Sequence, residues 1–306
     1  MHSSISNSRF VLTLAAFALF LLAGGLLRPL GKTRGLPLLQ QLSRKMRWQR
    51  EFDIVVGGDS RVQRGVSPSS IKEALPKARV ANFGFSAACF DEQYMNHLES
   101  LLATNSKSPT IVLGVTALSL TSYAKKNNEY REYAKKHSAE HFLNDHFGKF
   151  IFMFRPYKKR DLKKVLGWSK EQHIYYEAAQ ADGWIKTNRK PHLPTHALAE
   201  YKSLFSQYVY LKTQEDELLT KVEELVKKGI AVYAFRPPTT KAMTLLERKM
   251  CDFDEDEFIN EFRRRGGKWL HLAQTKYQSY DGSHIDGPSA KRLSKWIGEQ
   301  LAKQGH

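Results

Sequence analysis

Short apolar runs alternate with amphipathic segments along most of the chain. Five of these runs have the length and composition of buried strands and lie at 53–57, 79–83, 110–115, 230–235 and 268–272. The amphipathic segments predict helices at 68–75, 91–103, 198–228, 239–250, 254–265 and 288–303. Because strands that alternate with helices form a parallel sheet covered on both faces, the pattern predicts an α/β fold.

The stretch from about 120 to 195 departs from this rhythm. It is basic and rich in aromatic residues, with no strand–helix alternation, and we expect a mainly helical insertion. Within it, an apolar cluster at 147–154 is followed by a run of Lys and Arg. Aromatic side chains beside cations are typical of a membrane interface or a partner docking surface. They are equally typical of a small subdomain with an apolar core and a solvated basic face.

The seventeen residues from Val11 to Leu27 carry no charge, which is the short end of the length range for a membrane-spanning helix. A cleaved signal peptide is the alternative, but small residues lie inside the run and no suitable cleavage site follows it. We therefore expect a single-pass membrane anchor and basic linker over 1–50, followed by the α/β domain over 51–306. Basic residues directly after the run favour a cytoplasmic domain by the positive-inside rule.

The chain of 306 residues carries 48 Lys and Arg against 31 Asp and Glu, a formal net charge of +17. Residues 1–50 hold eight basic and no acidic side chains, and residues 121–170 hold thirteen basic and five acidic ones. The rest of the chain is therefore nearly neutral. No nucleic-acid-binding motif is visible, so the expected anionic partner is membrane lipid or an envelope polymer rather than nucleic acid. Two Cys residues exclude a disulfide-rich scaffold.

Polar residues with catalytic potential follow the predicted strands. In an open parallel sheet such residues gather at the carboxyl ends of the strands. Ser60 follows the first strand, Gly84 the second and Thr116 the third, while Asp281 and His284 precede the last helix. His284 can remove the proton of the Ser60 hydroxyl, and Asp281 can orient the imidazole. The backbone N–H groups of Ser60 and Gly84, with the hydroxyl of Thr116, are candidates to stabilise an oxyanion.

These residues resemble the blocks of the SGNH (GDSL-type) hydrolase family. The Gly-Asp-Ser sequence that ends at Ser60 matches the nucleophile block, and the pair Asp281 and His284 matches the acid–base block. Gly84 stands at the family's oxyanion-hole glycine. The family's Asn after the third strand is missing, and Thr116 stands nearest its place. The resemblance covers about 51–116 and 230–304, and it implies a three-layer α/β/α flavodoxin-like sheet of about five parallel strands.

A narrower resemblance is to membrane-anchored SGNH-like proteins that modify cell-envelope polymers, such as D-alanine-transfer and alginate-acetylation proteins. An apolar N-terminal run, an early Gly-Asp-Ser block and a C-terminal Asp-Gly-Ser-His block are shared with that group. The resemblance implies an extracytoplasmic catalytic domain, an envelope polysaccharide or other acyl-ester substrate, and a membrane-bound O-acyltransferase as partner. It implies no cofactor.

Two arginines near the predicted strand ends are candidates for binding an anionic substrate group. Arg61 follows the nucleophile, and Arg236 follows the fourth strand. Either guanidinium can bind a phosphate or a uronate carboxylate, and either can instead form a salt bridge. We expect Asp59, beside the nucleophile, to bond backbone at the turn rather than to react.

A competing motif lies in the insertion. His137, Glu140 and His141 match H-x-x-E-H, the inverted zinc-protease pattern. On a helix the two imidazoles would share one face, as a zinc ion requires. No third ligand can be singled out downstream, so a metallohydrolase is a remote alternative and we expect no metal.

The sequence thus predicts a membrane-anchored serine esterase or O-acyltransferase that acts on acyl esters of a cell-envelope glycan or polymer. The second hypothesis is a non-catalytic SGNH-like accessory subunit of a membrane acyltransferase complex.

Overall fold

The computed structural model describes residues 7–26, 36–153 and 174–305. Five strands form its central sheet in the order β2-β1-β3-β6-β7, and every neighbouring pair is parallel. The strands are β1 (Ile54–Gly58), β2 (Val80–Asn82), β3 (Thr110–Gly114), β6 (Ala231–Phe235) and β7 (Lys268–Trp269). Four lie within the predicted runs and β1 ends one residue beyond its run, and their order is that of the flavodoxin-like doubly wound sheet. The predicted α/β class is therefore confirmed.

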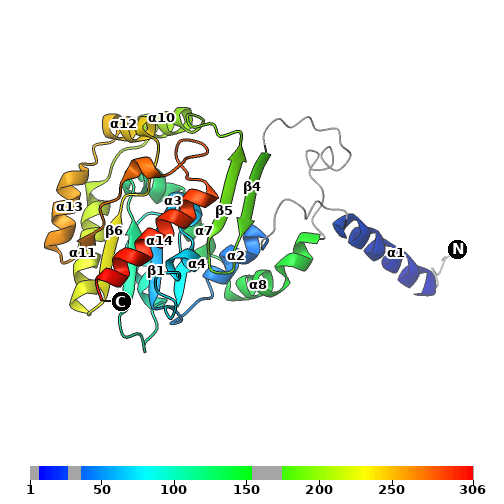
Figure 1. Ribbon diagram of the computed structural model, residues 1–306. Coiled ribbons are helices and arrows are strands. Elements are labelled where there is room, and N and C mark those ends of the chain that lie inside the picture. Colours follow the sequence, from blue (N-terminus) through cyan, green and yellow to red (C-terminus); the bar gives the residue numbers. More distant parts are fainter. Residues whose placement is uncertain (1–6, 27–35, 154–173, 306) are drawn as a thin grey trace.

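Helices cover both faces of this sheet, as Figure 1 shows. Successive side chains of a strand point to opposite faces, so Ile54 and Val56 enter one core and Val55 enters the other. The first core is closed by α3 (Ser60–Gly65), α4 (Pro68–Ile71) and α14 (Gly287–Lys303). The second is closed by α5 (Glu92–Ser100), α11 (Lys212–Lys227) and α13 (Glu255–Arg264). Two buried layers hold the sheet rigid, which fixes the strand ends that carry the site.

One predicted helix is divided in two. The segment 198–228 forms α10 (Leu198–Gln207) and α11, and Gly229 ends the second helix with a φ of +80°. Between them the backbone extends at Tyr208, and the Leu211 N–H donates to the Leu120 carbonyl at 2.9 Å. This hydrogen bond replaces one that a continuous helix would make. It ties the segment between α10 and α11 to the start of the insertion, just after β3. Helix α12 (Lys241–Met250) follows β6 along the chain.

The insertion is only partly helical, which corrects the prediction for 120–195. It begins with the short turn η2 (Leu118–Leu120) and the helices α6 (Ser122–Lys126), α7 (Glu129–Ala134) and α8 (Ser138–Met153). It then forms an antiparallel hairpin of β4 (Ile174–Ala179) and β5 (Ile185–Lys190). Gly183, with a φ of +93°, lies in the turn, where Asp-Gly is a hairpin signal. The basic run that follows Met153 lies outside the described residues.

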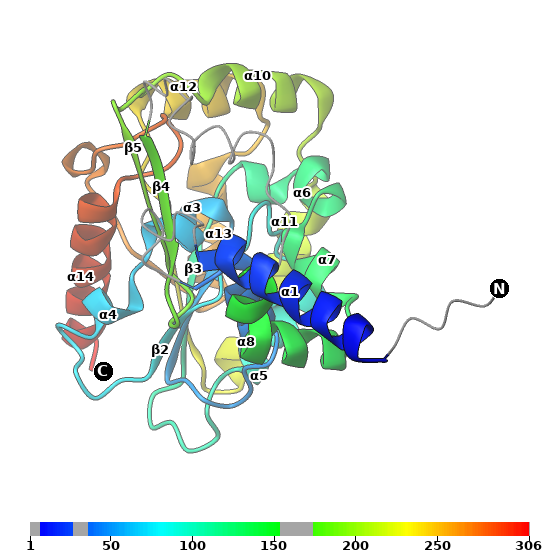
Figure 2. The same ribbon diagram turned by 90° about the vertical axis from the view of Figure 1, so that its right-hand side faces the viewer.

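The hairpin docks on the edge of the sheet (Figure 2). The Asn82 N–H donates to the Asp182 carbonyl at 3.0 Å, and a Cβ at Gly183 would lie 2.0 Å from the Asn82 carbonyl oxygen. The short helix α2 (Leu38–Lys45) lies beside the same turn, because the Gln41 amide donates to the carbonyls of Gln180 and Trp184. The close fit fixes the hairpin over the carboxyl end of the sheet.

A helix also forms over the apolar N-terminal run. This helix, α1 (Asn7–Leu26), projects away from the sheet and approaches the rest of the chain at α8 (Figures 1 and 2). Its large apolar side chains, including Phe10, Leu12 and Phe20, are exposed. Among the described residues no helix is both long enough and apolar enough to cross a membrane, so the predicted membrane-spanning helix is not found.

Candidate active site

Ser60 is held at the junction of β1 and α3. Asp59 caps α3, because its carboxylate accepts the Arg61 N–H at 2.9 Å, as expected for a structural residue at this turn. Gly58 makes the sharp exit from β1 possible: its φ is +150°, and a Cβ there would lie 2.8 Å from the Gly114 carbonyl oxygen. Ser60 is therefore the first residue of the helix, directly above the carboxyl end of the central strands.

The structure brings the three predicted catalytic residues together. The Ser60 Oγ lies 2.9 Å from Nε2 of His284, and Nδ1 of His284 lies 2.8 Å from Oδ2 of Asp281. Burial alone would raise the pKa of Asp281, but the facing His284 and hydrogen bonds from His284 and Ser283 lower that pKa to about 2. Asp281 is therefore ionised at neutral pH, where its charge holds the imidazole in the tautomer that accepts the serine proton.

A tight turn places His284. The backbone N–H groups of Ser283 and His284 donate to Oδ1 of Asp281 at 2.8 and 2.7 Å. The Ser279 hydroxyl accepts the Gly282 N–H at 2.8 Å and donates to the His284 carbonyl at 2.7 Å. Gly282, with a φ of +103°, leaves room for the Pro194 carbonyl, which a Cβ would approach to 2.4 Å. These local bonds fix the imidazole before any substrate arrives.

Ser60 and His284 open into a cavity of about 360 Å³. The insertion and the segment after it form much of its wall. The residues that they contribute are Tyr123, Tyr175, Arg189, His196, Ala197, Glu200, Tyr201 and Leu204. Sequence patterns singled out none of these side chains, because they lie far from the catalytic blocks along the chain.

The two predicted oxyanion-hole residues are directed elsewhere, and this corrects the prediction. The Gly84 N–H donates to Oδ1 of Asn82 at 2.8 Å, and the Gly84 carbonyl accepts from Nζ of Lys45 at 2.7 Å. The Thr116 hydroxyl donates its single proton to Asp59 at 2.6 Å. Both predicted donors are thus used within the fold. The Thr116 bond ties the end of β3 to the turn that carries the nucleophile, and the Gly84 bonds tie the end of β2 to α2.

Two backbone N–H groups remain at the cavity, that of Ser60, which the sequence predicts, and that of Ala87, which it does not. Ser60 and Ala87 both line it, and within the described part of the chain neither N–H has an acceptor. Ala87 has a φ of +50°, a conformation that is uncommon outside glycine and that concentrates at functional sites. These two N–H groups are the best candidates in this structure to stabilise an oxyanion.

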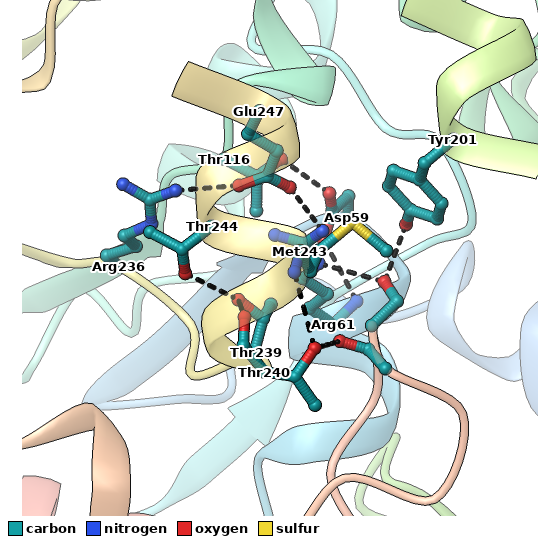
Figure 3. A network of polar contacts seen from close by, with 12 residues as sticks. Asp59, Arg61, Thr116, Tyr201, Arg236, Thr239, Thr240, Met243, Thr244 and Glu247 are labelled. Atoms are coloured by element: carbon teal, nitrogen blue, oxygen red, sulfur yellow. Dashed lines mark hydrogen bonds and ion pairs between the residues drawn. The ribbon is translucent and has the colours of Figure 1, made fainter. Parts of the chain in front are cut away.

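Arg61 is buried away from the substrate cavity, which corrects its predicted role. Its Nη2 pairs with Oε1 of Glu247 at 2.5 Å, and its Nε donates to the Ser283 hydroxyl at 3.1 Å (Figure 3). The Ser283 hydroxyl donates in turn to the Tyr201 hydroxyl at 2.7 Å. Burial alone would lower the pKa of Arg61, but Glu247 raises it above its usual value. Arg61 therefore links the nucleophile helix to the turn of His284 and is a positioning residue.

Arg236 belongs to the same buried network. It pairs with Oε2 of Glu247 at 2.7 Å (Figure 3), and it also pairs with Glu255. It lines a second cavity rather than the one at Ser60. The predicted role of Arg236 in binding substrate beside Ser60 therefore does not fit the geometry. Glu247 is fully enclosed, and although burial would raise its pKa, the two arginines lower it.

The H-x-x-E-H motif lies at the start of α8. Nε2 of His141 lies 3.0 Å from the Tyr133 carbonyl oxygen, and Glu140 pairs with Lys136. Among the residues that the structure describes, no group of three or more His, Cys, Asp or Glu side chains is arranged to hold a metal ion. The motif therefore forms ordinary helix contacts here.

No model of a known protein family matches this chain, and no curated protein matches it either. The arguments for function therefore rest on the residues and their geometry.

Proposed function

We propose that this protein is a serine esterase or O-acyltransferase that uses Ser60, His284 and Asp281 as a catalytic triad. The observation that carries the proposal is the unbroken chain of contacts from the Ser60 hydroxyl through His284 to Asp281. It opens into a cavity large enough for a small ester. A serine hydroxyl with an adjacent base and an oriented third group is the general arrangement of an activated nucleophile.

The geometry supports a two-step acyl transfer. Nε2 of His284 removes the Ser60 proton as Oγ attacks the acyl carbon, and the imidazolium is stabilised by Asp281. The N–H groups of Ser60 and Ala87, which line the cavity and have no acceptor among the described residues, donate to the developing oxyanion. His284 then protonates the leaving alcohol, which departs and leaves an acyl-serine. Water or a sugar hydroxyl, deprotonated by His284, attacks this ester and releases Ser60.

The setting is part of the same proposal. We place the protein at a membrane, with its catalytic domain outside the cytoplasm and with acyl esters of a cell-envelope glycan or polymer as substrates. A membrane-bound O-acyltransferase is the proposed partner. The exposed apolar side chains of α1 support membrane association. Fractionation of cells that express the full chain, followed by protease treatment of intact spheroplasts, tests this. Recovery in the soluble fraction, or protection from added protease, contradicts it.

The experiment for the chemistry is labelling with a fluorophosphonate probe alongside hydrolysis of 4-nitrophenyl acetate. Ser60→Ala abolishes the adduct and lowers the hydrolysis rate by at least about 10³-fold. His284→Ala lowers the rate of adduct formation and the rate of hydrolysis by a similar factor. Ser86→Ala is the matched control. Ser86 lines the same cavity, but its hydroxyl contacts Gln63 rather than a base, so the adduct still forms.

An intact protein that never forms an adduct at Ser60 contradicts the proposal and leaves the non-catalytic accessory subunit. Mass spectrometry of products made in the presence of a sugar alcohol separates the two reactions. Acylated sugar indicates transfer, and free acid indicates hydrolysis.

A further inference from the structure

One face of the β4–β5 hairpin forms a wall of the substrate cavity. Tyr175 and Arg189 are cross-strand partners in the hairpin register, so their side chains lie on the same face. Both line the cavity with Ser60 and His284. Alternation along a strand directs the next residue, Lys190, to the opposite face, and Lys190 is exposed.

Arg189 lines the same cavity as the catalytic histidine. The Tyr280 ring stacks on the His284 imidazole with centroids 5.9 Å apart, and the Tyr175 ring meets Tyr280 edge-on at 6.3 Å. Arg189 stands opposite Tyr175 in the hairpin. Aromatic rings therefore line the cavity between His284 and the hairpin that carries Arg189.

Arg189 differs from the other arginines around the site in having no carboxylate partner among the described residues. Arg61 is paired with Glu247, and Arg64, which also lines the cavity, lies 3.7 Å from Glu177. By contrast, Arg189 lines the cavity and forms no ion pair within the described residues. A guanidinium that no carboxylate neutralises is available to an anion bound in the cavity.

Neither of the two carboxylates that line the cavity forms an ion pair with Arg189 in the described structure. Asp281 is occupied by His284, and Glu200 is exposed on α10. His196, which also lines the cavity, adds a further potential donor. The wall beside the triad therefore presents hydrogen-bond donors and a cation to a bound molecule.

We propose that Arg189 binds an anionic oxygen group of the substrate, a carboxylate or a phosphate, next to the ester that Ser60 attacks. A guanidinium binds either group through two parallel N–H···O bonds. The inference rests on the proposed function for its place in a reaction, but binding of the anion can be measured without catalysis. It moves anion recognition from Arg61 and Arg236 to a residue of the insertion.

Calorimetry on the Ser60→Ala variant of the full chain tests binding independently of the triad's activity. The probes are glucuronate and glycerol 3-phosphate, with methyl glucuronate ester and glycerol as neutral counterparts. We expect the anions to bind at least about tenfold more tightly than their neutral counterparts, since a charge-assisted hydrogen bond contributes more than about 1.4 kcal/mol. Adding Arg189→Gln removes this preference, Arg189→Lys retains part of it, and Lys190→Gln retains all of it.

The relative affinities for the two anions show whether the site is built for a carboxylate or a phosphate. Equal binding of anions by the Arg189→Gln and parent proteins overturns the inference, provided that thermal unfolding shows both to be folded. So does a parent protein that does not distinguish the anions from their neutral counterparts.

A kinetic arm uses the catalytically intact protein and acetylated glucuronate beside its methyl ester. Arg189→Gln should lower the ratio of kcat/KM for the acid to kcat/KM for the ester at least tenfold, and Lys190→Gln should preserve it. Anion binding without any turnover would contradict the proposed function and leave the anion site intact. Turnover without an Arg189-dependent preference would contradict the anion site and leave the proposed function intact.

Discussion

The sheet body, residues 51–116 and 230–305, and the insertion, residues 120–195, contribute different parts of one cavity. The body supplies Ser60, Asp281 and His284, which are joined by hydrogen bonds to one another, and Asp281 also accepts two backbone N–H groups of its own turn. The insertion supplies wall residues such as Tyr175 and Arg189, and the Arg189 guanidinium has no such restraint among the described residues. Under the proposed function, the sheet body sets the reaction and the hairpin sets the selectivity, so substitutions in the two regions should have separable effects.

The largest effect is expected in the body. Asp281→Asn keeps the size of the side chain but removes the charge that holds His284 in its productive tautomer. We expect kcat for 4-nitrophenyl acetate to fall about 10⁴-fold, as in other triads. The free energy of unfolding should change by much less than the activation free energy does. A loss of less than tenfold would show that Asp281 does not orient the base.

The second prediction concerns the ion pairs behind the nucleophile. Arg61→Met leaves Glu247 buried with one partner lost, and removing one member of a buried pair costs about 3–5 kcal/mol. Urea unfolding measures this cost. Arg79→Met is the control, because its pair with Asp53 has an arginine side chain 47% exposed, where a pair contributes about 0–1 kcal/mol. Similar losses of unfolding free energy in the two variants would show that the buried ion pairs behind Ser60 do not stabilise the site more than an exposed pair does.

The third prediction tests the junction between the two regions. Lys45 is fully buried against the Gly84 carbonyl, and burial lowers the pKa of its ammonium to about 7. Between pH 7 and 9 the unfolded chain therefore binds more protons at this position than the folded chain does. The free energy of unfolding should rise with pH there, by at most about 1.4 kcal/mol per unit.

Urea unfolding of the wild-type chain and of Lys45→Met across this range measures the difference in slope. We expect Lys45→Met to have the flatter profile and the exposed control Lys72→Met to follow the wild type. Identical slopes for Lys45→Met and wild type would show that Lys45 keeps its proton in the folded state.

The smallest effect on the reactivity of Ser60 is expected from a substitution inside the insertion. A Cβ at Gly148 of α8 would lie 2.6 Å from Cβ of Gln40 on α2, so Gly148→Val must separate the two helices. Overpacking of this kind costs about 1–3 kcal/mol, measurable by thermal unfolding. Labelling of Ser60 at 25 °C should persist, since the triad belongs to the body. Loss of labelling in a folded Gly148→Val protein would break the division between the two regions.

The sequence predicts those parts of the molecule that depend on local pattern. The five strands follow from their apolar runs, Ser60 follows from its place at a strand end, and Asp281 and His284 follow from their place before the last helix. The hairpin had a local signal too, because Tyr175 and Tyr176 lie in a short strand-like run before the Asp182–Gly183 turn. The irregular composition of the insertion obscured it.

Pairing between distant residues is what the sequence does not predict. Arg61 looks like a substrate ligand until Glu247, 186 residues further on, is seen to bind it. Likewise, the Thr116 hydroxyl looks available until its bond to Asp59 is known. For Arg189 the decisive property is a missing partner, which no pattern along the chain reveals.

The separation of Ser60 and His284 has a consequence for the newly made protein. The two side chains in contact are 224 positions apart. At roughly 5–20 residues per second of synthesis, Ser60 exists for on the order of 10 s or more before its base has been made. During that interval its hydroxyl has the reactivity of an ordinary alcohol. Under the proposed mechanism, the nascent chain therefore cannot attack an acyl ester until His284 has been made and the domain has folded.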